Sequence, residues 1–244
     1  MSLAWSSVKS LSIPVGGVSR DVKRVTAGGV TLWEKPNPLP YDAEVEYIES
    51  TGTQWIDTGV YPGNSDSFSI NISGRWIKNN TTEGVFASFY KASGLGLNLS
   101  CTSIRMYVYT SSQTNITETA GDFTLAINFT GSALTATING RAISAGWDAN
   151  LKGSNLPLYL WNRPDTLARP SRSGSRIYSM SVYTNGVLVR DFQPVRVGSG
   201  ANAVGCLYDK LGTGGMNPDG TARNDGLYFN RGSGAFVVGP DNNS

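Results

Sequence analysis

The sequence predicts an all-β protein: a two-sheet antiparallel jelly-roll sandwich preceded by a small β-module. Apolar and polar residues alternate along several segments, which is the period of a strand with one buried face. Only 16% of the 244 residues are charged, whereas Gly alone accounts for 29. No window keeps the 3.6-residue period of a helix, so we expect at most a helical turn or two. Short strands joined by tight turns, without helices, favour a sandwich.

The clearest strands are those in which every second residue is apolar. In residues 68–76, Phe68, Ile70 and Ile72 alternate with polar residues. In residues 123–129, every second residue is a large apolar one, beginning with Phe123 and ending with Phe129. Leucines alternate with Gly and Asn in residues 95–100 in the same way. Each segment therefore places one apolar face toward a core.

Two Asn-Gly pairs predict tight hairpins. Asn139-Gly140 and Asn185-Gly186 each lie between strand-like segments. Both central residues of a type I′ turn need positive φ, which Asn and Gly tolerate. We therefore expect antiparallel strand pairs on either side of each turn.

The chain is predicted to divide at a proline-rich segment. Residues 1–35 contain three strand-like stretches, 10–18, 21–29 and 30–35, with Gly-Gly turn signals in the first two. Residues 36–41, PNPLPY, read as a stiff linker because proline fixes φ and lacks an N–H donor. The main domain is then 42–244, and the first piece is too small to hold a core alone.

Composition excludes several classes of function. The chain has no histidine, the commonest general base and metal ligand, and its net charge is only +2. We expect no enzyme, no nucleic-acid partner and no resident metal. Cys101 and Cys206 are either two buried free thiols or one disulfide, and the sequence leaves both possibilities open.

The hydropathy pattern predicts neither export by a standard signal peptide nor insertion in a membrane. The first 17 residues, MSLAWSSVKSLSIPVGG, lack a continuous apolar stretch. No segment reaches the roughly 18 apolar residues of a membrane span.

Four ordered segments carry a resemblance to a known domain family. They are YIESTGTQWIDTG from Tyr47, RIYSMSVYTNGVLVRDFQPVR from Arg176, GCLYDK from Gly205 and LYFNRGSGAFVVGPD from Leu227. Together they resemble a concanavalin A-like, lectin or laminin-G-type domain of gut-bacterial and phage proteins, over residues 42–241. The resemblance implies a jelly roll with adjacent first and last strands and a role in binding. The insertion at residues 211–226 departs from the family pattern, and we expect an exposed loop there.

The segment 1–35, ending in GGVTLWEK, is similar to small β-modules at the head of phage tail and fibre proteins. This likeness implies docking to virion or tail proteins and a location in an extracellular particle. It also implies a homo-oligomer, with a trimer as the form that fits a fibre or spike.

Aromatic residues near strand ends are the candidates for sugar stacking, since a ring can pack on the apolar face of a sugar beside polar side chains. The best cluster is Trp161-Asn162-Arg163, and Trp76, Trp147 and Tyr90 are further candidates. The alternative is that these rings close the edges of the core.

The segment 163–176 contains four arginines against Asp165 alone, namely Arg163, Arg169, Arg172 and Arg176. Such a loop could bind acidic glycans or an acidic neighbouring subunit through its guanidinium groups. The alternative is a solvated loop, which its prolines and serines also fit.

Carboxylates offer two weaker possibilities. Glu44 and Glu46 have the alternate spacing of a glycosidase pair, but they lie beside the linker, which favours a solvated edge strand. The resemblance suggests structural roles for Asp191 and Asp209. A Ca²⁺ site is a minor possibility at the oxygen-bearing residues of one loop: Asn217, Asp219, Asn224 and Asp225.

The sequence thus favours a non-enzymatic phage virion protein, a tail fibre, spike or capsid decoration, whose lectin-like domain binds host-surface or mucosal glycans. Three alternatives remain: a bacterial surface carbohydrate-binding or adhesion protein, a virion component without a ligand, and a glycoside hydrolase.

Overall fold

The computed structural model describes residues 12–15, 18–21, 24–27, 30–34, 39–62, 67–76, 84–88, 98–101, 106–109, 113–116, 121–130, 134–143, 156–162 and 175–242. The chain divides into two units, Met1–Leu39 and Pro40–Ser244. The division falls inside the proline-rich segment 36–41. Among the described residues, no helix is long and apolar enough to cross a membrane.

The first unit contains two antiparallel hairpins. Strand β1 (Ser12–Val15) pairs with β2 (Val18–Asp21), and β3 (Arg24–Ala27) pairs with β4 (Val30–Glu34). We expected three strands here and find four among the described residues, because β2 (Val18–Asp21) lies between the first two predicted stretches. A two-stranded sheet is marginally stable at best by itself.

The second unit is built on a large antiparallel sheet, ordered β15-β14-β13-β8-β17-β18-β19-β20 within the described residues. Three short strands lie off this path: β5 pairs with β18, β6 pairs with β17, and β21 pairs with β6. The bounds of the eleven strands are β5 Ala43–Glu44, β6 Ile48–Ser50, β8 Phe68–Trp76, β13 Gly121–Phe129, β14 Leu134–Ile138, β15 Arg141–Ile143, β17 Ser175–Thr184, β18 Val187–Val197, β19 Val204–Asp209, β20 Leu227–Tyr228 and β21 Val237–Val238.

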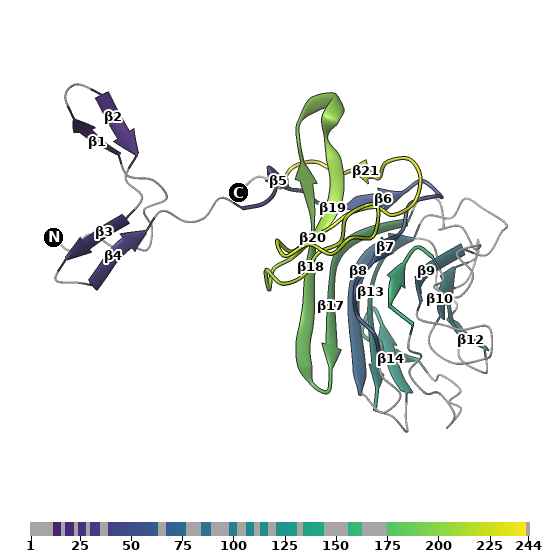
Figure 1. The fold of residues 1–244 in the computed structure, drawn as a ribbon. Helices are drawn as coiled ribbons and strands as arrows, with labels where there is room; N and C mark the ends of the chain where they lie inside the picture. The colour runs from purple at the N-terminus through teal and green to yellow at the C-terminus, as the bar shows by residue number, and fades with distance from the viewer. Residues whose placement is uncertain are drawn as a thin grey trace. The chain divides into compact units, whose positions relative to one another are not determined.

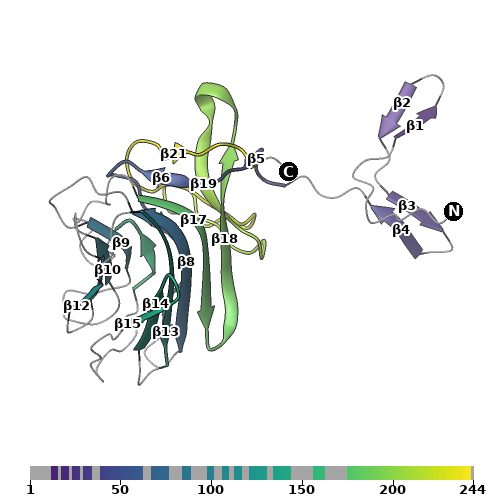
Figure 2. The same ribbon diagram turned by 180° about the vertical axis from the view of Figure 1, so that it is seen from behind.

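A second sheet, ordered β12-β11-β10-β9-β16-β7, forms the other layer. Figures 1 and 2 show β9 and β10 in one layer, with β8, β13 and β17 in the other. The bounds of its strands are β7 Ile56–Asp57, β9 Gly84–Ser88, β10 Asn98–Cys101, β11 Met106–Tyr109, β12 Gln113–Ile116 and β16 Tyr159–Leu160. This two-layer antiparallel arrangement confirms the predicted jelly-roll sandwich.

The core follows the alternation seen in the sequence. In β8 the side chains of Phe68, Ile70, Ile72 and Trp76 are buried, and in β13 every second residue from Phe123 to Phe129 is buried in the same way. Burying one such side chain contributes about 1.5–3 kcal/mol. Of the third predicted segment, residues 95–97 lie outside the described residues, and β10 begins at Asn98.

Both predicted Asn-Gly hairpins are confirmed. Asn139 and Gly140 have φ of 49° and 76°, and Asn185 and Gly186 have φ of 51° and 75°. The amide oxygen of Asn139 also accepts a hydrogen bond from the backbone N–H of Thr124 on the neighbouring strand. The turns fix the register of β14 with β15 and of β17 with β18.

The two ends of the main domain lie side by side, as the resemblance implied. Ile48 in β6 is paired with Val238 in β21. Beyond this pair, the hydroxyl of Thr53 donates to the carbonyl of Ser233, and the N–H of Trp55 donates to the side chain of Asn230. The sequence segments near residues 47–59 and 227–241 therefore form one structural seam.

Candidate functional site

Two aromatic rings predicted as ligand platforms lie in the core. Trp161 and Trp76 are 0% and 1% exposed. The indole N–H of Trp161 donates to the hydroxyl of Ser175 at 2.8 Å, and its ring packs 5.0 Å from that of Phe236. Asn162 is buried as well. These rings fill the space between the sheets and offer no face to a ligand, which corrects the prediction for Trp161 and Trp76.

The basic segment is described only at its end. Arg176 belongs to strand β17, where its guanidinium donates to the carboxylate of Glu49 at 2.6 Å and lies 4.0 Å from the centre of the Tyr47 ring. Its charge is thus paired, and it fastens β17 to β6; this corrects its assignment to a basic loop. The other predicted residues lie outside the described part of the chain: Trp147, Tyr90, Arg163, Arg169 and Arg172.

The two predicted carboxylates are exposed: Glu44 ends the short strand β5, and Glu46 lies just beyond it. Glu44 accepts hydrogen bonds from the hydroxyl of Tyr41 at 3.0 Å and from the amide of Gln193 at 3.2 Å. Glu46 is exposed. Both carboxylates are thus in contact with solvent, and Glu44 is bonded to neighbouring side chains.

The insertion at residues 211–226 is folded onto the sandwich rather than simply exposed. Met216 packs against the core, and its N–H donates to the carbonyl of Leu227. Asp219 accepts bonds from Thr221, and Asp225 is paired with Arg223. No group of three or more His, Cys, Asp or Glu residues able to hold a metal ion occurs in the described ranges.

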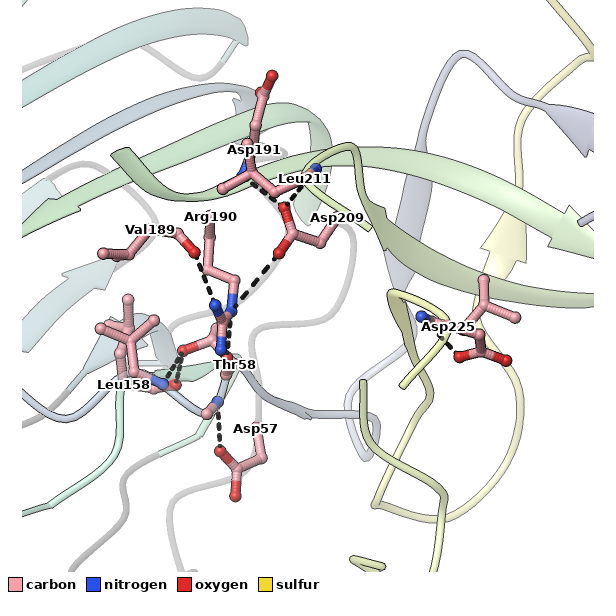
Figure 3. Close-up of polar contacts among 12 residues, drawn as sticks. Asp57, Thr58, Leu158, Val189, Arg190, Asp191, Asp209, Leu211 and Asp225 are labelled. Atoms are coloured by element: carbon pink, nitrogen blue, oxygen red, sulfur yellow. Dashed lines mark hydrogen bonds and ion pairs between the residues drawn. The ribbon is translucent and has the colours of Figure 1, made fainter. Parts of the chain in front are cut away.

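A buried polar cluster joins the two sheets (Figure 3). The guanidinium of Arg190, from β18, donates to the carbonyl of Thr58 at 3.1 Å, next to β7 of the opposite sheet. It also donates to its neighbour Val189 and lies 3.8 Å from the carboxylate of Asp209. Arg190 therefore acts as a clamp between the layers.

Asp209 completes this clamp from β19. One of its carboxylate oxygens accepts the backbone N–H groups of Asp191 and Leu211 at 2.9 and 3.2 Å. Burial raises the pKa of the Asp209 carboxyl, against the lowering effects of these two N–H groups and of Arg190. Because Asp209 is 0% exposed, it is inaccessible to a ligand, and its role is structural.

The outer face of the large sheet is different, because two hollows open on it. One, of about 390 Å³, lies over β8, β13, β14 and the end of β17. The other, of about 320 Å³, lies over β8, β13, β14 and β17 and is also lined by Asp191 of β18 and by Lys210. The two share Asn71, Ala126 and Thr137, so they are neighbours on one face.

The first hollow is lined by small polar side chains and one ring. Ser69 and Asn71 come from β8, and Thr137 comes from β14. Tyr183, half-buried, contributes the aromatic ring at the end of β17, beside the Gly186 turn. These positions alternate with the buried ones in each strand, so they point away from the core.

The second hollow adds more hydroxyls and a single charge pair. Ser181 accepts a hydrogen bond from the Asn71 amide at 3.3 Å. At the border, the Lys210 ammonium and the Asp191 carboxylate are 2.8 Å apart. Hydroxyl and amide groups both donate and accept hydrogen bonds, so this face is suited to a ligand rich in hydroxyl groups.

This polar face was missed in the sequence, although a signal for it was present. The outward positions of β8 are Ser69, Asn71 and Ser73, followed by Arg75 at the end of the strand, and β17 continues the neutral pattern with Ser181 and Tyr183. Outer faces of sandwiches commonly carry long charged side chains, whereas Ser69, Asn71, Ser73 and Ser181 are short and neutral. This run of short, uncharged outward positions indicates a face with room for a ligand.

No protein-family model and no curated protein matches the chain. Among solved structures, it is similar to the CBM40 module of the Ruminococcus gnavus IT-sialidase bound to α2,3-sialyllactose, with 14% identity and a TM-score of 0.41. That match covers 57% of this chain and 89% of the module.

Two further structures are similar in the same way. A Bacteroides ovatus protein described as carbohydrate-binding has 13% identity and a TM-score of 0.46, over 91% of this chain and 66% of that one. The alginate lyase AlgAT5 of polysaccharide lyase family 7 has 14% identity and a TM-score of 0.36, over 49% of this chain and 60% of the lyase. At such identities the likeness concerns the fold alone. It gives no link to phage proteins.

Proposed function

We propose that this protein is a non-catalytic glycan-binding protein and that the glycan lies on the outer face of the large sheet, over the two hollows. The observation that carries this proposal is the lining of those hollows. Two adjacent hollows of about 390 and 320 Å³ fall within the size range of ligand sites, which is roughly 300–1,000 Å³.

The chemistry of the lining supports a sugar as the occupant. Hydroxyl and amide groups of Ser69, Asn71 and Thr137 match the alternating donors and acceptors of a sugar ring. Tyr183 offers an aromatic surface at one end, where the apolar face of a sugar can stack. Short side chains also leave the backbone within reach of a ligand.

Asn71 is the best residue for a test, because it lines both hollows. We expect Asn71→Ala to weaken glycan binding about tenfold, equivalent to about 1.4 kcal/mol, without changing the melting temperature. Binding to a glycan array, followed by calorimetry with the best ligand, measures the effect. The matched control is Asn224→Ala, in an exposed position of the 211–226 segment outside the hollows. Equal binding by wild type and Asn71→Ala contradicts the proposed site.

A second proposal concerns the N-terminal unit. Met1–Leu39 forms a separate unit with two two-stranded sheets, and such sheets gain stability by packing on something larger. We propose that this unit docks the lectin-like domain onto an assembly, in the form of a phage tail, spike or capsid. Many copies on one particle would raise avidity for weakly bound glycans.

Particle association tests this docking role. The full chain is expected to copurify with particles from its source, and a chain lacking residues 1–39 is expected to remain free while keeping its glycan binding. Light scattering of the two proteins would show whether the unit also drives trimer formation. Incorporation of the shortened chain at the wild-type level argues against docking through this unit.

A further inference from the structure

We infer that the glycan bound by the outer face is an uncharged chain of several sugars, rather than a single terminal sugar or an acidic polymer. This inference rests on the proposed function and assigns the ligand class of the same site. It follows from two features of the hollows, their continuity and their charge.

Continuity comes from the residues that the hollows share. Asn71 of β8, Ala126 of β13 and Thr137 of β14 border both. Asn71 and Ala126 are direct partners in the β8–β13 pairing, so the boundary between the hollows runs across neighbouring strands. The Ala126 side chain at this boundary is too small to separate the two hollows. A ligand can therefore extend from the Tyr183 end to the Asp191 end.

The charges argue against an acidic ligand. The described residues lining the first hollow carry no charge. Those lining the second include Asp191 and Lys210, which neutralise each other at 2.8 Å. A carboxylate of a uronic or sialic acid would find no unpaired cation there and would face the Asp191 carboxylate. Arginine clusters of the kind that bind carboxylates are absent from this described lining.

Chain length is tested with the protein and a panel of neutral hexose oligosaccharides, as disaccharides and hexasaccharides of the same sugar. We expect a hexasaccharide to bind at least about tenfold more tightly than its disaccharide. Ala126→Trp places a large side chain on the boundary and is expected to remove this advantage. Ala201→Trp, in the exposed 3-10 turn Gly200–Asn202, is the matched control and is expected to leave it unchanged.

Charge is tested with Asp191→Asn, which frees the Lys210 ammonium beside the second hollow. We expect wild type to prefer neutral chains and the variant to gain several-fold in affinity for oligouronates, with a gain that salt suppresses. Asp122→Asn is the matched control, since Asp122 pairs with Arg75 on the same outer face beyond both hollows. Asp122→Asn is expected to leave the affinity for oligouronates unchanged.

The outcomes separate the two proposals. Binding that Asn71→Ala weakens, but that prefers acidic chains or is equal for disaccharide and hexasaccharide, overturns the ligand class and leaves the site intact. Binding unaffected by both Asn71→Ala and Ala126→Trp, or no glycan binding at all, overturns the site and with it the inference. A neutral preference that grows with length and disappears in Ala126→Trp supports both.

Discussion

The clamp between the sheets gives the most specific stability prediction. Arg190→Met keeps most of the length of the side chain but removes the guanidinium. Two charge-assisted hydrogen bonds are then lost, to the carbonyls of Thr58 at 3.1 Å and Val189 at 2.6 Å. Asp209 is left buried without its cation at 3.8 Å. Removing one partner of a buried charge pair costs about 3–5 kcal/mol, and we expect a loss in that range.

Urea unfolding measures the loss of unfolding free energy in four proteins: wild type, Arg190→Met, Asp209→Asn and the double variant. Comparison of the four shows how much of the loss comes from the Arg190–Asp209 pair. In Asp209→Asn the amide oxygen still accepts the N–H groups of Asp191 and Leu211, so this variant is expected to lose only about 1–2 kcal/mol. Arg190→Met should cost less when Asp209 is already neutral, with a coupling of about 1–2 kcal/mol. A loss below about 1 kcal/mol in Arg190→Met, or no coupling, would refute the clamp.

The pH dependence provides an internal check. Burial raises the pKa of Asp209 above its ordinary value of 3.8, so the folded state holds its proton to higher pH than the unfolded chain does. This group therefore lowers stability as pH rises from its unfolded pKa through its folded pKa. Loss of the Arg190 guanidinium raises the folded pKa further, so the deficit of Arg190→Met should be smaller in acid than at neutral pH. A deficit independent of pH would exclude Asp209 as its source.

Three further predictions concern the core and the seam. Trp161→Ala should lower the free energy of unfolding by about 3–5 kcal/mol, measured in urea, because it empties a fully buried site; a loss below about 1 kcal/mol would contradict its position in the core. Gly232→Ala should cost about 1–3 kcal/mol or more in a thermal melt, since an added Cβ would lie 1.9 Å from the carbonyl oxygen of Thr53; an unchanged melting temperature would show that the seam is looser than described. The free thiol of Cys206 is buried, and burial raises its pKa, so in a Cys101→Ser background it should react with a thiol reagent only on unfolding; rapid labelling of the native protein would disprove its burial.

Most of the sandwich could be predicted because local rules and tertiary packing agree there. The alternation in residues 68–76 and 123–129 requires one buried face, and the two strands pair directly with each other. The Asn-Gly turns permit the backbone angles that tight hairpins need. Register irregularities were not predictable in this way, and the shift in β17 between Ile177 and Ser179 is one example, since it depends on the strand beside it.

Sequence reasoning misplaced Trp161 and Trp76 because it searched for the residue types that usually bind sugars, and those types also build cores. A tryptophan at a strand end has the same local sequence whether it faces solvent or fills the gap between sheets, and for Trp161 and Trp76 the opposite sheet decides the outcome. The hollows of the outer face depend instead on small side chains, none of which by itself indicates a binding site in the sequence. Ser69, Asn71 and Ala126 form a hollow only because β8 and β13 pair in one register, and a shift of one residue would turn these side chains inward and expose the core. The stability of the sandwich and the shape of its proposed binding face therefore depend on the same pairing, so substitutions that shift this register should abolish glycan binding together with folding.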